Sequence, residues 1–194
     1  MSVELIQKLR NQTGAGMMDV KKALDEAAGD ESKALDLLRK RGQKIAAKKQ
    51  NERDAKDGIV EAYIHGAGKV GSMIVIASET DFVAKNEEFK ALAHEIAMQV
   101  AAMKPEYISS DEVPEDIKAK EMEIYKEQLA KEGKPENVME KILEGKMNKF
   151  YEGVCLLDQV YIKDDKKKIK DLITDATAKL GEKIEVKKMV VFSL

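Results

Sequence analysis

The chain has 194 residues, with 34 basic and 36 acidic side chains, a net charge of −2 and 43% hydrophobic residues. This composition is typical of a globular protein of one or two domains and excludes a disordered chain. A broad nucleic-acid-binding surface would need an excess of basic residues on some domain, which the charge balance argues against. We therefore expect no direct nucleic-acid partner.

Cysteine content and hydropathy predict a reducing, non-membrane environment. Cys155 is the only cysteine, so no disulfide can form within the chain. The first ten residues lack the apolar core of a signal peptide. The longest apolar run, near Val70–Ala77, is too short to cross a bilayer. We expect a cytoplasmic protein with no membrane partner.

The first part of the chain predicts short helices. Apolar side chains recur at three- and four-residue spacing from Val3 to Leu9, and the T-G-A-G stretch at Thr13–Gly16 interrupts this pattern. A second helix follows. It begins either after Asp19 as its N-cap or already at Met17 and the next methionine.

A third helix completes this helical region. Gly29 and Asp30 are expected to end the second helix and to cap the third, which should end at Gly42. Residues 1–42 are therefore predicted to form a three-helix domain. Residues 43–57 are polar and have few apolar anchors, which predicts a linker, although their alanine, lysine and glutamate residues tolerate a helix.

The pattern then changes to strands. Residues 58–65 and 70–77 predict a β-hairpin joined by the G-A-G-K turn at Gly66–Lys69. Asn86 is a favourable N-cap for the helix that follows. The apolar stripe of that helix begins at Phe89.

The remaining chain predicts an α+β fold. Residues 114–152 are expected to form a helical hairpin around a turn at Gly133–Pro135. A helix at 169–180 should end at the glycine that follows it, and the segment from Ile184 predicts a strand that joins the hairpin's sheet. The predicted core, residues 58–194, is a three-stranded antiparallel sheet packed by helices, with the helical hairpin attached.

Signatures of enzymes are nearly absent. The turn at Gly66–Lys69 lacks the spacing of a phosphate-binding loop and joins two strands rather than a strand and a helix. His65 and His94 have no cysteine or histidine nearby as a second ligand. Cys155 has apolar neighbours, which favours a buried side chain over a reactive thiol. We expect no catalytic residue, no metal and no cofactor, and a binding or regulatory protein rather than an enzyme.

One short stretch leaves two interpretations open. In S-E-T-D-F-V-A-K-N, Ser78–Asn86, Phe82 lies between an apolar strand and a helical pattern. From the pattern alone we favour a core position under the following helix. If Asn86 caps that helix, however, Thr80–Lys85 form a short turn from which a bulky side chain can project.

Three stretches carry a resemblance to a known family. They are L-R-N-Q-T-G-A-G-M-M-D-V-K-K-A-L at Leu9–Leu24, R-D-A-K-D-G at Arg53–Gly58, and T-D-F-V-A-K-N at Thr80–Asn86. In content, order and separation they resemble bacterial elongation factor Ts, and the resemblance covers the whole chain. One departure is Val160 in L-L-D-Q-V-Y-I-K-D, where the family commonly has proline.

The resemblance implies a translation elongation factor. Such a protein is a guanine-nucleotide exchange factor that binds elongation factor Tu, disturbs its Mg²⁺ site and promotes GDP release. The resemblance assigns the disturbance of the Mg²⁺ site to Thr80, Asp81, Phe82 and Val83. For Phe82 it thereby favours a contact with the partner over a place in the core.

The resemblance also implies further contacts. The N-terminal three helices would form a ubiquitin-associated-like domain that contacts the GTPase domain of Tu. We expect those contacts from Gly14, Ala15, Gly16, Met17, Met18, Lys21 and Lys22, although Met17 and Met18 could equally be core residues. Because similar short members dimerise, a homodimer through the C-terminal strand or the Cys155 region is also expected.

A ubiquitin-associated-like adaptor without exchange activity is the alternative function. The first forty residues would permit it. The T-D-F-V-A-K-N turn and the α+β core are what it leaves unexplained.

Overall fold

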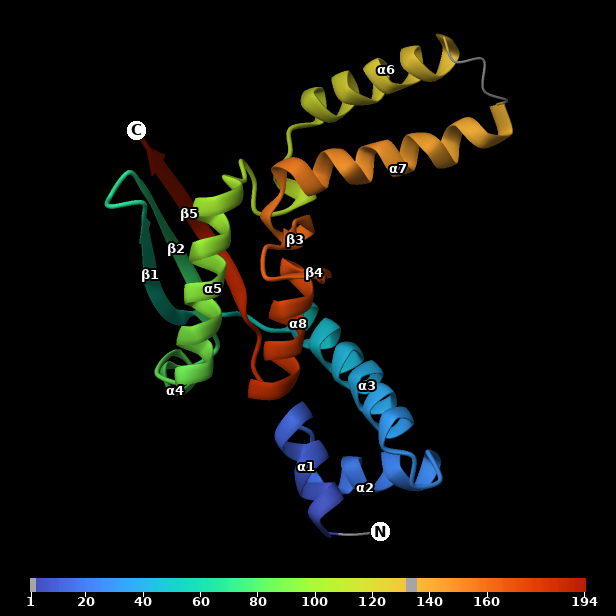
Figure 1. Ribbon diagram of the computed structural model, residues 1–194, viewed down its shortest axis with the longest axis vertical. Helices are drawn as coiled ribbons and strands as arrows, with labels where there is room; N and C mark the ends of the chain where they lie inside the picture. The colour runs from blue at the N-terminus through green and yellow to red at the C-terminus, as the bar shows by residue number, and fades with distance from the viewer. Residues whose placement is uncertain (1–2, 132–135) are drawn as a thin grey trace.

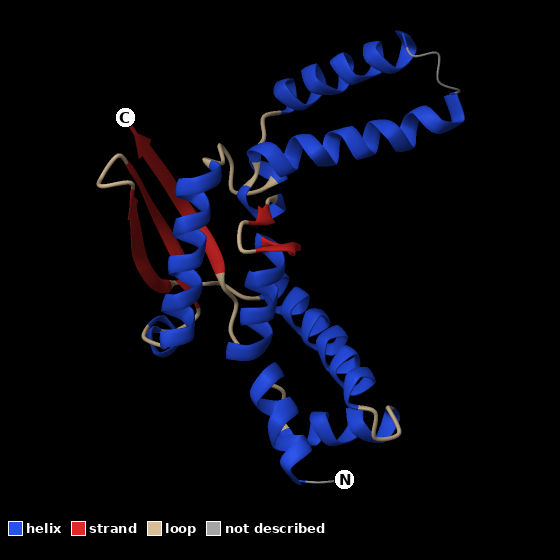
Figure 2. Cartoon of the chain, in the orientation of Figure 1, coloured by secondary structure: helices blue, strands red, loops and turns tan. Residues whose placement is uncertain are grey.

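A computed structural model describes residues 3–131 and 136–194, where the chain has the predicted α+β fold (Figure 1). The helices in these ranges are α1 (Val3–Thr13), α2 (Met17–Glu26), α3 (Glu31–Glu52), α4 (Asp81–Ala84), α5 (Glu87–Met103), α6 (Glu115–Lys131), α7 (Glu136–Val154) and α8 (Ile169–Leu180). The strands are β1 (Asp57–His65), β2 (Val70–Ser78), β3 (Val160–Tyr161), β4 (Asp164–Lys168) and β5 (Glu185–Ser193). Figure 2 shows the longer strands gathered on one side of the molecule.

The first three helices pack around their own small core. Leu9 of α1, Val20 and Leu24 of α2, and Leu38 of α3 are buried together. Asp30 caps α3 as predicted, because its carboxylate accepts a hydrogen bond from the backbone N–H three residues later at 3.0 Å.

The start of α2 decides between the two interpretations of the sequence. This helix begins at Met17, with Gly16 at the N-cap position. Asp19 lies in the first turn instead of capping the helix, so the earlier of the two starts is correct. An acidic side chain in this position still interacts favourably with the helix dipole.

The end of α3 differs from the prediction. The helix passes through Gly42 and continues to Glu52, so residues 43–52 of the expected linker are helical. A Cβ at Gly42 would lie 3.1 Å from the Cβ of Ala178 in α8. The glycine therefore allows α3 to pack closely on α8 rather than ending the helix. The domain boundaries at residues 42 and 57 stay a prediction.

The three-stranded sheet has the order β1-β2-β5, and both pairs are antiparallel. The predicted hairpin and the C-terminal strand that joins it are thus confirmed. Helix α5 covers one face of this sheet in Figure 1, and Ile74 and Ile76 of β2 are buried with Phe89 and Ile96 of α5. Asn86 caps α5 as predicted, accepting a hydrogen bond from the N–H of Glu88 at 2.8 Å.

The opposite face of the sheet is apolar and exposed. Strand register places Ala62, Met73 and Val190 in one row across the sheet, and Ile64 beside Phe192 across Gly71 in the next. These large apolar side chains are exposed: Val60, Ile64, Met73, Val190 and Phe192. Contiguous exposed apolar surface of this kind marks interaction sites. We call these residues the outer sheet face.

The helical hairpin of α6 and α7 projects away from the rest of the chain (Figure 1). Leu129 and Met147 are buried between helices whose other side chains are mostly exposed. The turn expected at Gly133–Pro135 lies outside the described residues. At the base of the hairpin, Cys155 is fully buried as predicted, and it is therefore not itself a surface for a second copy.

Helix α8 ends as predicted. Gly181 follows it in the left-handed conformation, with φ of 80°, and its N–H donates to the carbonyl of Thr177. Across the residues that the structure describes, no helix is both long and apolar enough to cross a membrane.

Candidate partner-binding site

The segment between β2 and α5 forms an isolated helical turn. Thr80 occupies the N-cap position of α4, which ends at Ala84, and Asn86 then starts α5. The two N-cap residues are six positions apart, so α4 is one short turn between the strand and the long helix. The segment therefore forms a tip at the end of the sheet and of α5, below both in Figure 1.

Phe82 projects from this tip. Its side chain is 82% exposed, whereas Ala84 is buried and Val83 packs against the main core. Because neighbouring residues of a helical turn face different directions, burial of Val83 and Ala84 holds Phe82 outward. The core position under α5 is occupied by Phe89, which is fully buried. The core interpretation of Phe82, which the local pattern favoured, is wrong.

Asp81 is ionised at neutral pH. Its carboxylate accepts a hydrogen bond from Lys85 Nζ at 2.6 Å. This hydrogen bond and the lysine charge hold the pKa of Asp81 below its ordinary value, and the aspartate in turn raises the pKa of Lys85. The pair is exposed, so it adds little to stability. Asp81 and Lys85 therefore place an exposed ion pair next to an exposed aromatic ring.

Thr80 is held from outside the turn. Its N–H and its hydroxyl both donate hydrogen bonds to the carboxylate of Glu182, at 3.0 and 2.7 Å. The hydroxyl of Ser78 donates to the carbonyl of Thr80 at 3.0 Å. Sequence analysis missed Glu182 because it lies 102 positions from Thr80, and no local pattern connects the two.

The N-terminal loop divides the predicted contact residues into two groups. Gly14 has φ of 67°, and a Cβ there would lie 2.8 Å from the Cα of Lys179, so this glycine serves close packing on α8. Ala15 packs against the core of the three helices. Both residues support the loop, and Gly16 provides the N-cap of α2.

The other predicted residues are on the surface of α2. Met17 and Met18 are 58% and 64% exposed, so the alternative that places them in the core is wrong. Lys21 and Lys22 are exposed on the same helix. We call Met17, Met18, Lys21 and Lys22 the α2 surface. Exposed methionines adapt to the shape of a partner, and the lysines favour an acidic one.

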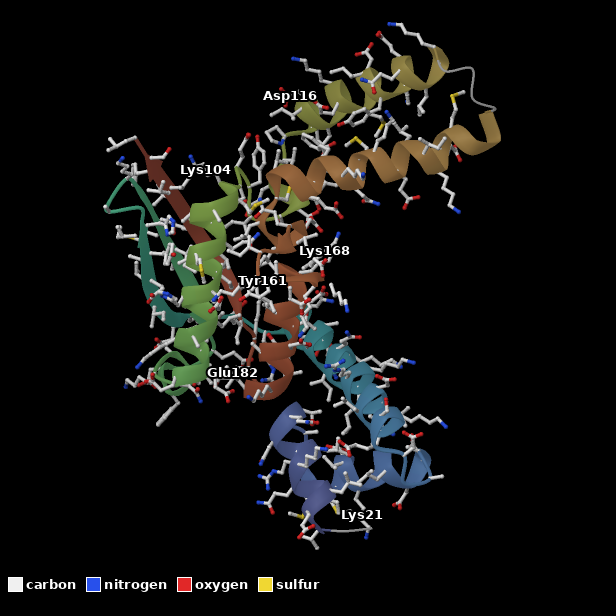
Figure 3. All side chains as sticks on the ribbon, in the orientation of Figure 1. Lys21, Lys104, Asp116, Tyr161, Lys168 and Glu182 are labelled. Carbon is white, nitrogen blue, oxygen red and sulfur yellow. The ribbon has the colours of Figure 1, made fainter. Side chains whose placement is uncertain are left out.

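The two predicted surfaces are separate. Figure 3 shows Lys21 at the far end of the N-terminal helices and Glu182 beside α4, at the end of α8. A partner that uses both surfaces must be large enough to reach along the N-terminal helices.

Two side chains that could take part in chemistry, Cys155 and His94, have structural environments instead. Burial, and then the charge of Asp158, raises the pKa of Cys155 to about 11, so its thiol is protonated at neutral pH. His94 bonds Glu61 through Nδ1 at 2.9 Å. Within the described part of the chain, no group of three or more His, Cys, Asp or Glu side chains could hold a metal ion.

Comparison with known proteins decides the family. The family model described as "Elongation factor TS" matches residues 3–194. The elongation factor Ts of Carboxydothermus hydrogenoformans is 51% identical over 191 residues, which cover 98% of this chain and 88% of that protein. The chain belongs to the elongation factor Ts family. The elongation factor Ts proteins of Anaeromyxobacter dehalogenans strain 2CP-1 and Moorella thermoacetica are each 52% identical, covering 100% and 97% of this chain and 88% and 93% of theirs.

Family membership confirms the resemblance and the function class. The chain is a translation elongation factor that acts as a nucleotide exchange factor, and the partner that the elongation factor Ts family implies is elongation factor Tu. The match spans both the N-terminal helices and the sheet. The roles of single residues are a separate question, which the geometry of the site helps to answer.

Proposed function

We propose that the turn Thr80–Val83 enters the GTPase domain of elongation factor Tu, disturbs its Mg²⁺ site and thereby releases GDP. The observation that carries this proposal is the 82% exposure of Phe82 on a turn whose neighbouring residues are anchored. Because the fold itself leaves most of this phenylalanine side chain in solvent, the ring is available to pack against a partner.

The proposal follows from thermodynamic linkage. An exchange factor forms no bonds with its substrate and must bind the nucleotide-free GTPase more tightly than the nucleotide-bound form, so nucleotide and factor weaken each other equally. Mg²⁺ requires near-ideal octahedral geometry, so a small displacement of its protein ligands weakens the bound state. A wedge beside the ion is therefore an effective place to act.

Magnitudes show that Phe82 does not act alone. Accelerating release about ten-thousand-fold requires roughly 5.5 kcal/mol of barrier lowering. Burying one phenylalanine supplies about 1.5–3 kcal/mol. The remainder must come from lost Mg²⁺ and phosphate contacts and from docking elsewhere on the chain.

We propose that the α2 surface supplies much of that docking. Met17 and Met18 provide exposed apolar area, and Lys21 and Lys22 provide positive charge next to it. Because this surface lies away from the turn, it holds the partner without touching the nucleotide site. Its role is affinity, while the role of the turn is exchange.

We also propose that two copies of the chain pair through the outer sheet face. Its apolar rows cross all three strands, and β5, the expected C-terminal contact, contributes Val190 and Phe192. An apolar sheet face that is exposed among the described residues is suited to contact with a second apolar surface. A self-complementary pairing of this face would form a two-fold symmetric dimer.

Release of a fluorescent GDP analogue from elongation factor Tu of the same organism tests the proposed function. Acceleration at substoichiometric concentrations of this chain is expected. Tu binding without acceleration would instead support the ubiquitin-associated-like adaptor. The exposed turn and the sheet, which that alternative leaves unused, favour exchange.

A further inference from the structure

The loop between α8 and β5, residues 181–184, contacts both the exposed turn and the N-terminal helices. Glu182 in this loop accepts two hydrogen bonds from Thr80, one from the backbone N–H at 3.0 Å and one from the hydroxyl at 2.7 Å. Figure 3 shows Glu182 beside α4, at the end of α8. Both oxygens of one carboxylate thus hold the residue that begins the turn carrying Phe82.

This arrangement replaces the usual cap of α4. An N-cap threonine ordinarily accepts a hydrogen bond from a backbone N–H of its own helix, but the Thr80 side chain makes no such bond. Its hydroxyl donates to Glu182 instead. A helix of four residues is too short to be stable by itself. The burial of Val83 and Ala84 keeps Phe82 on the outside, and the hydrogen bonds at the start of α4 further restrict its direction.

Neighbouring contacts fix the loop in turn. The N–H of Lys183 donates to the carboxylate of Glu79 at 2.6 Å, and Glu79 also pairs with Arg53 at 3.0 Å. Lys49 donates to the carbonyl of Gly181, and Gln50 donates to the carbonyl of Ile184 at 2.7 Å. The C-terminal end of α3, with Lys49 and Gln50, contacts the loop that holds Thr80. Arg53, which follows α3, supports that loop through Glu79.

We propose that Glu182 is a positioning residue for nucleotide exchange. It fixes Thr80 so that Phe82 is presented to the partner in one orientation, and it does so without touching the partner. The exchange part of this inference rests on the proposed role of Phe82. The orienting part does not, because it concerns the free chain alone.

The physical reason is the cost of ordering a loop on binding. When a binding segment is already held in its bound conformation, less conformational entropy is lost as the complex forms. Loss of two hydrogen bonds to a carboxylate should let the turn sample other orientations. We expect Glu182→Ala to slow catalysed GDP release about tenfold.

The orienting part can be tested without any partner. The chain contains no tryptophan, so Phe82→Trp creates a single tryptophan reporter at the tip, which can be excited selectively over the five tyrosines. Time-resolved anisotropy of this reporter should show larger and faster local motion after Glu182→Ala. Unchanged anisotropy would overturn the inference, whatever Phe82 does in exchange.

A matched control separates orientation from charge. Glu185 lies three residues further along and pairs with Lys183 and Lys187 rather than with Thr80. Glu185→Ala removes the same charge at the start of β5, next to this loop, and should leave the reporter's motion unchanged. Thr80→Val removes the hydroxyl that donates to Glu182 and should therefore also increase the local motion of the reporter. Thr80→Ser keeps a hydroxyl and should leave that motion unchanged. These two variants keep the test available if Glu182→Ala folds poorly.

The exchange part needs a double-mutant cycle. Glu182→Ala should slow GDP release in the natural background and have little further effect once Phe82→Ala is present, because both act through one side chain. A full tenfold effect in the Phe82→Ala background would overturn a positioning role and indicate that Glu182 acts elsewhere. If Phe82→Ala alone leaves release unchanged, the proposed function fails, while the anisotropy result still decides the orienting part.

Discussion

At the scale of single residues, two phenylalanines in one segment have opposite environments. Phe82 is 82% exposed and Phe89 is fully buried, although only seven positions separate them. The difference arises because the chain starts one helix at Thr80 and another at Asn86. In α4, Val83 and Ala84 face the core and Phe82 faces outward, whereas in α5 Phe89 faces the sheet.

This contrast predicts different effects on stability. Phe89→Ala should lower the free energy of unfolding by about 3–5 kcal/mol, because it leaves a cavity in the core. Phe82→Ala should change it by less than about 0.5 kcal/mol. Denaturant unfolding followed by circular dichroism measures both. If Phe82→Ala lowered the free energy of unfolding by several kcal/mol, Phe82 would have to be a core residue.

The site itself was only partly predictable at this scale. The sequence motif proposes Thr80–Val83 as the contact, which stays a prediction, whereas the local pattern favoured burial of Phe82 under the helix that starts at Asn86. The hydrogen bonds from Thr80 to Glu182 connect residues 102 positions apart, and a single sequence carries no periodicity that reports such a pair. The solvent exposure of Met17 and Met18 likewise depends on which face of α2 meets the other helices.

At the scale of elements, most helices and strands were predictable because their signals are local. The short apolar runs of β1 and β2 with the glycine-containing turn between them, the Asn86 cap and the glycine after α8 all act within a few residues. The predicted end of α3 was wrong because the reason for Gly42 is a contact with α8, far away in sequence. A glycine required by packing and a glycine that ends a helix look the same in the sequence.

Two other glycines give a matched test of how the N-terminal helices dock. Gly14 and Gly29 both have positive φ, but only at Gly14 would an added Cβ meet backbone atoms, those of Lys179 in α8. Gly29→Ala should cost about 1 kcal/mol from backbone strain alone. Gly14→Ala should cost clearly more and should also increase protease cleavage near the end of α3.

Equal losses of unfolding free energy for the two alanine variants would contradict this view. They would show that the loop at Gly14 moves away from α8 without penalty. The glycine would then serve only the local turn between α1 and α2.

At the scale of the whole molecule, binding and exchange should be separable. Helix α2 and helix α4, which carries Phe82, lie in different parts of the molecule (Figure 1). Met17→Ala combined with Met18→Ala should weaken affinity for Tu about tenfold or more, since it removes exposed apolar contacts. The rate of GDP release at saturating concentration should stay near its natural value.

Titration of the release rate against concentration measures both quantities. Met103→Ala is the control, because it removes an exposed methionine from the end of α5 instead of from α2. A loss of maximal rate with unchanged affinity would assign Met17 and Met18 to the exchange step and contradict the division of roles.

Self-association is a second property of the whole molecule. A charge placed in the middle of the outer sheet face, as in Val190→Glu, should dissociate the proposed dimer, because an unpaired charge cannot be buried cheaply. Sedimentation velocity should then show one species at the monomer mass. If the natural chain is already a monomer, the proposed dimer does not form, and a dimer that persists in the variant would place the pairing elsewhere.

The central claim is that the exposed Phe82 drives nucleotide release. Stopped-flow release of a fluorescent GDP analogue from elongation factor Tu, with the natural chain and with Phe82→Ala at equal folded concentration, tests it most directly. Because burial of one phenylalanine is worth about 1.5–3 kcal/mol, release catalysed by the variant should be about 10- to 100-fold slower. Release at the natural rate by a folded Phe82→Ala variant would contradict the claim.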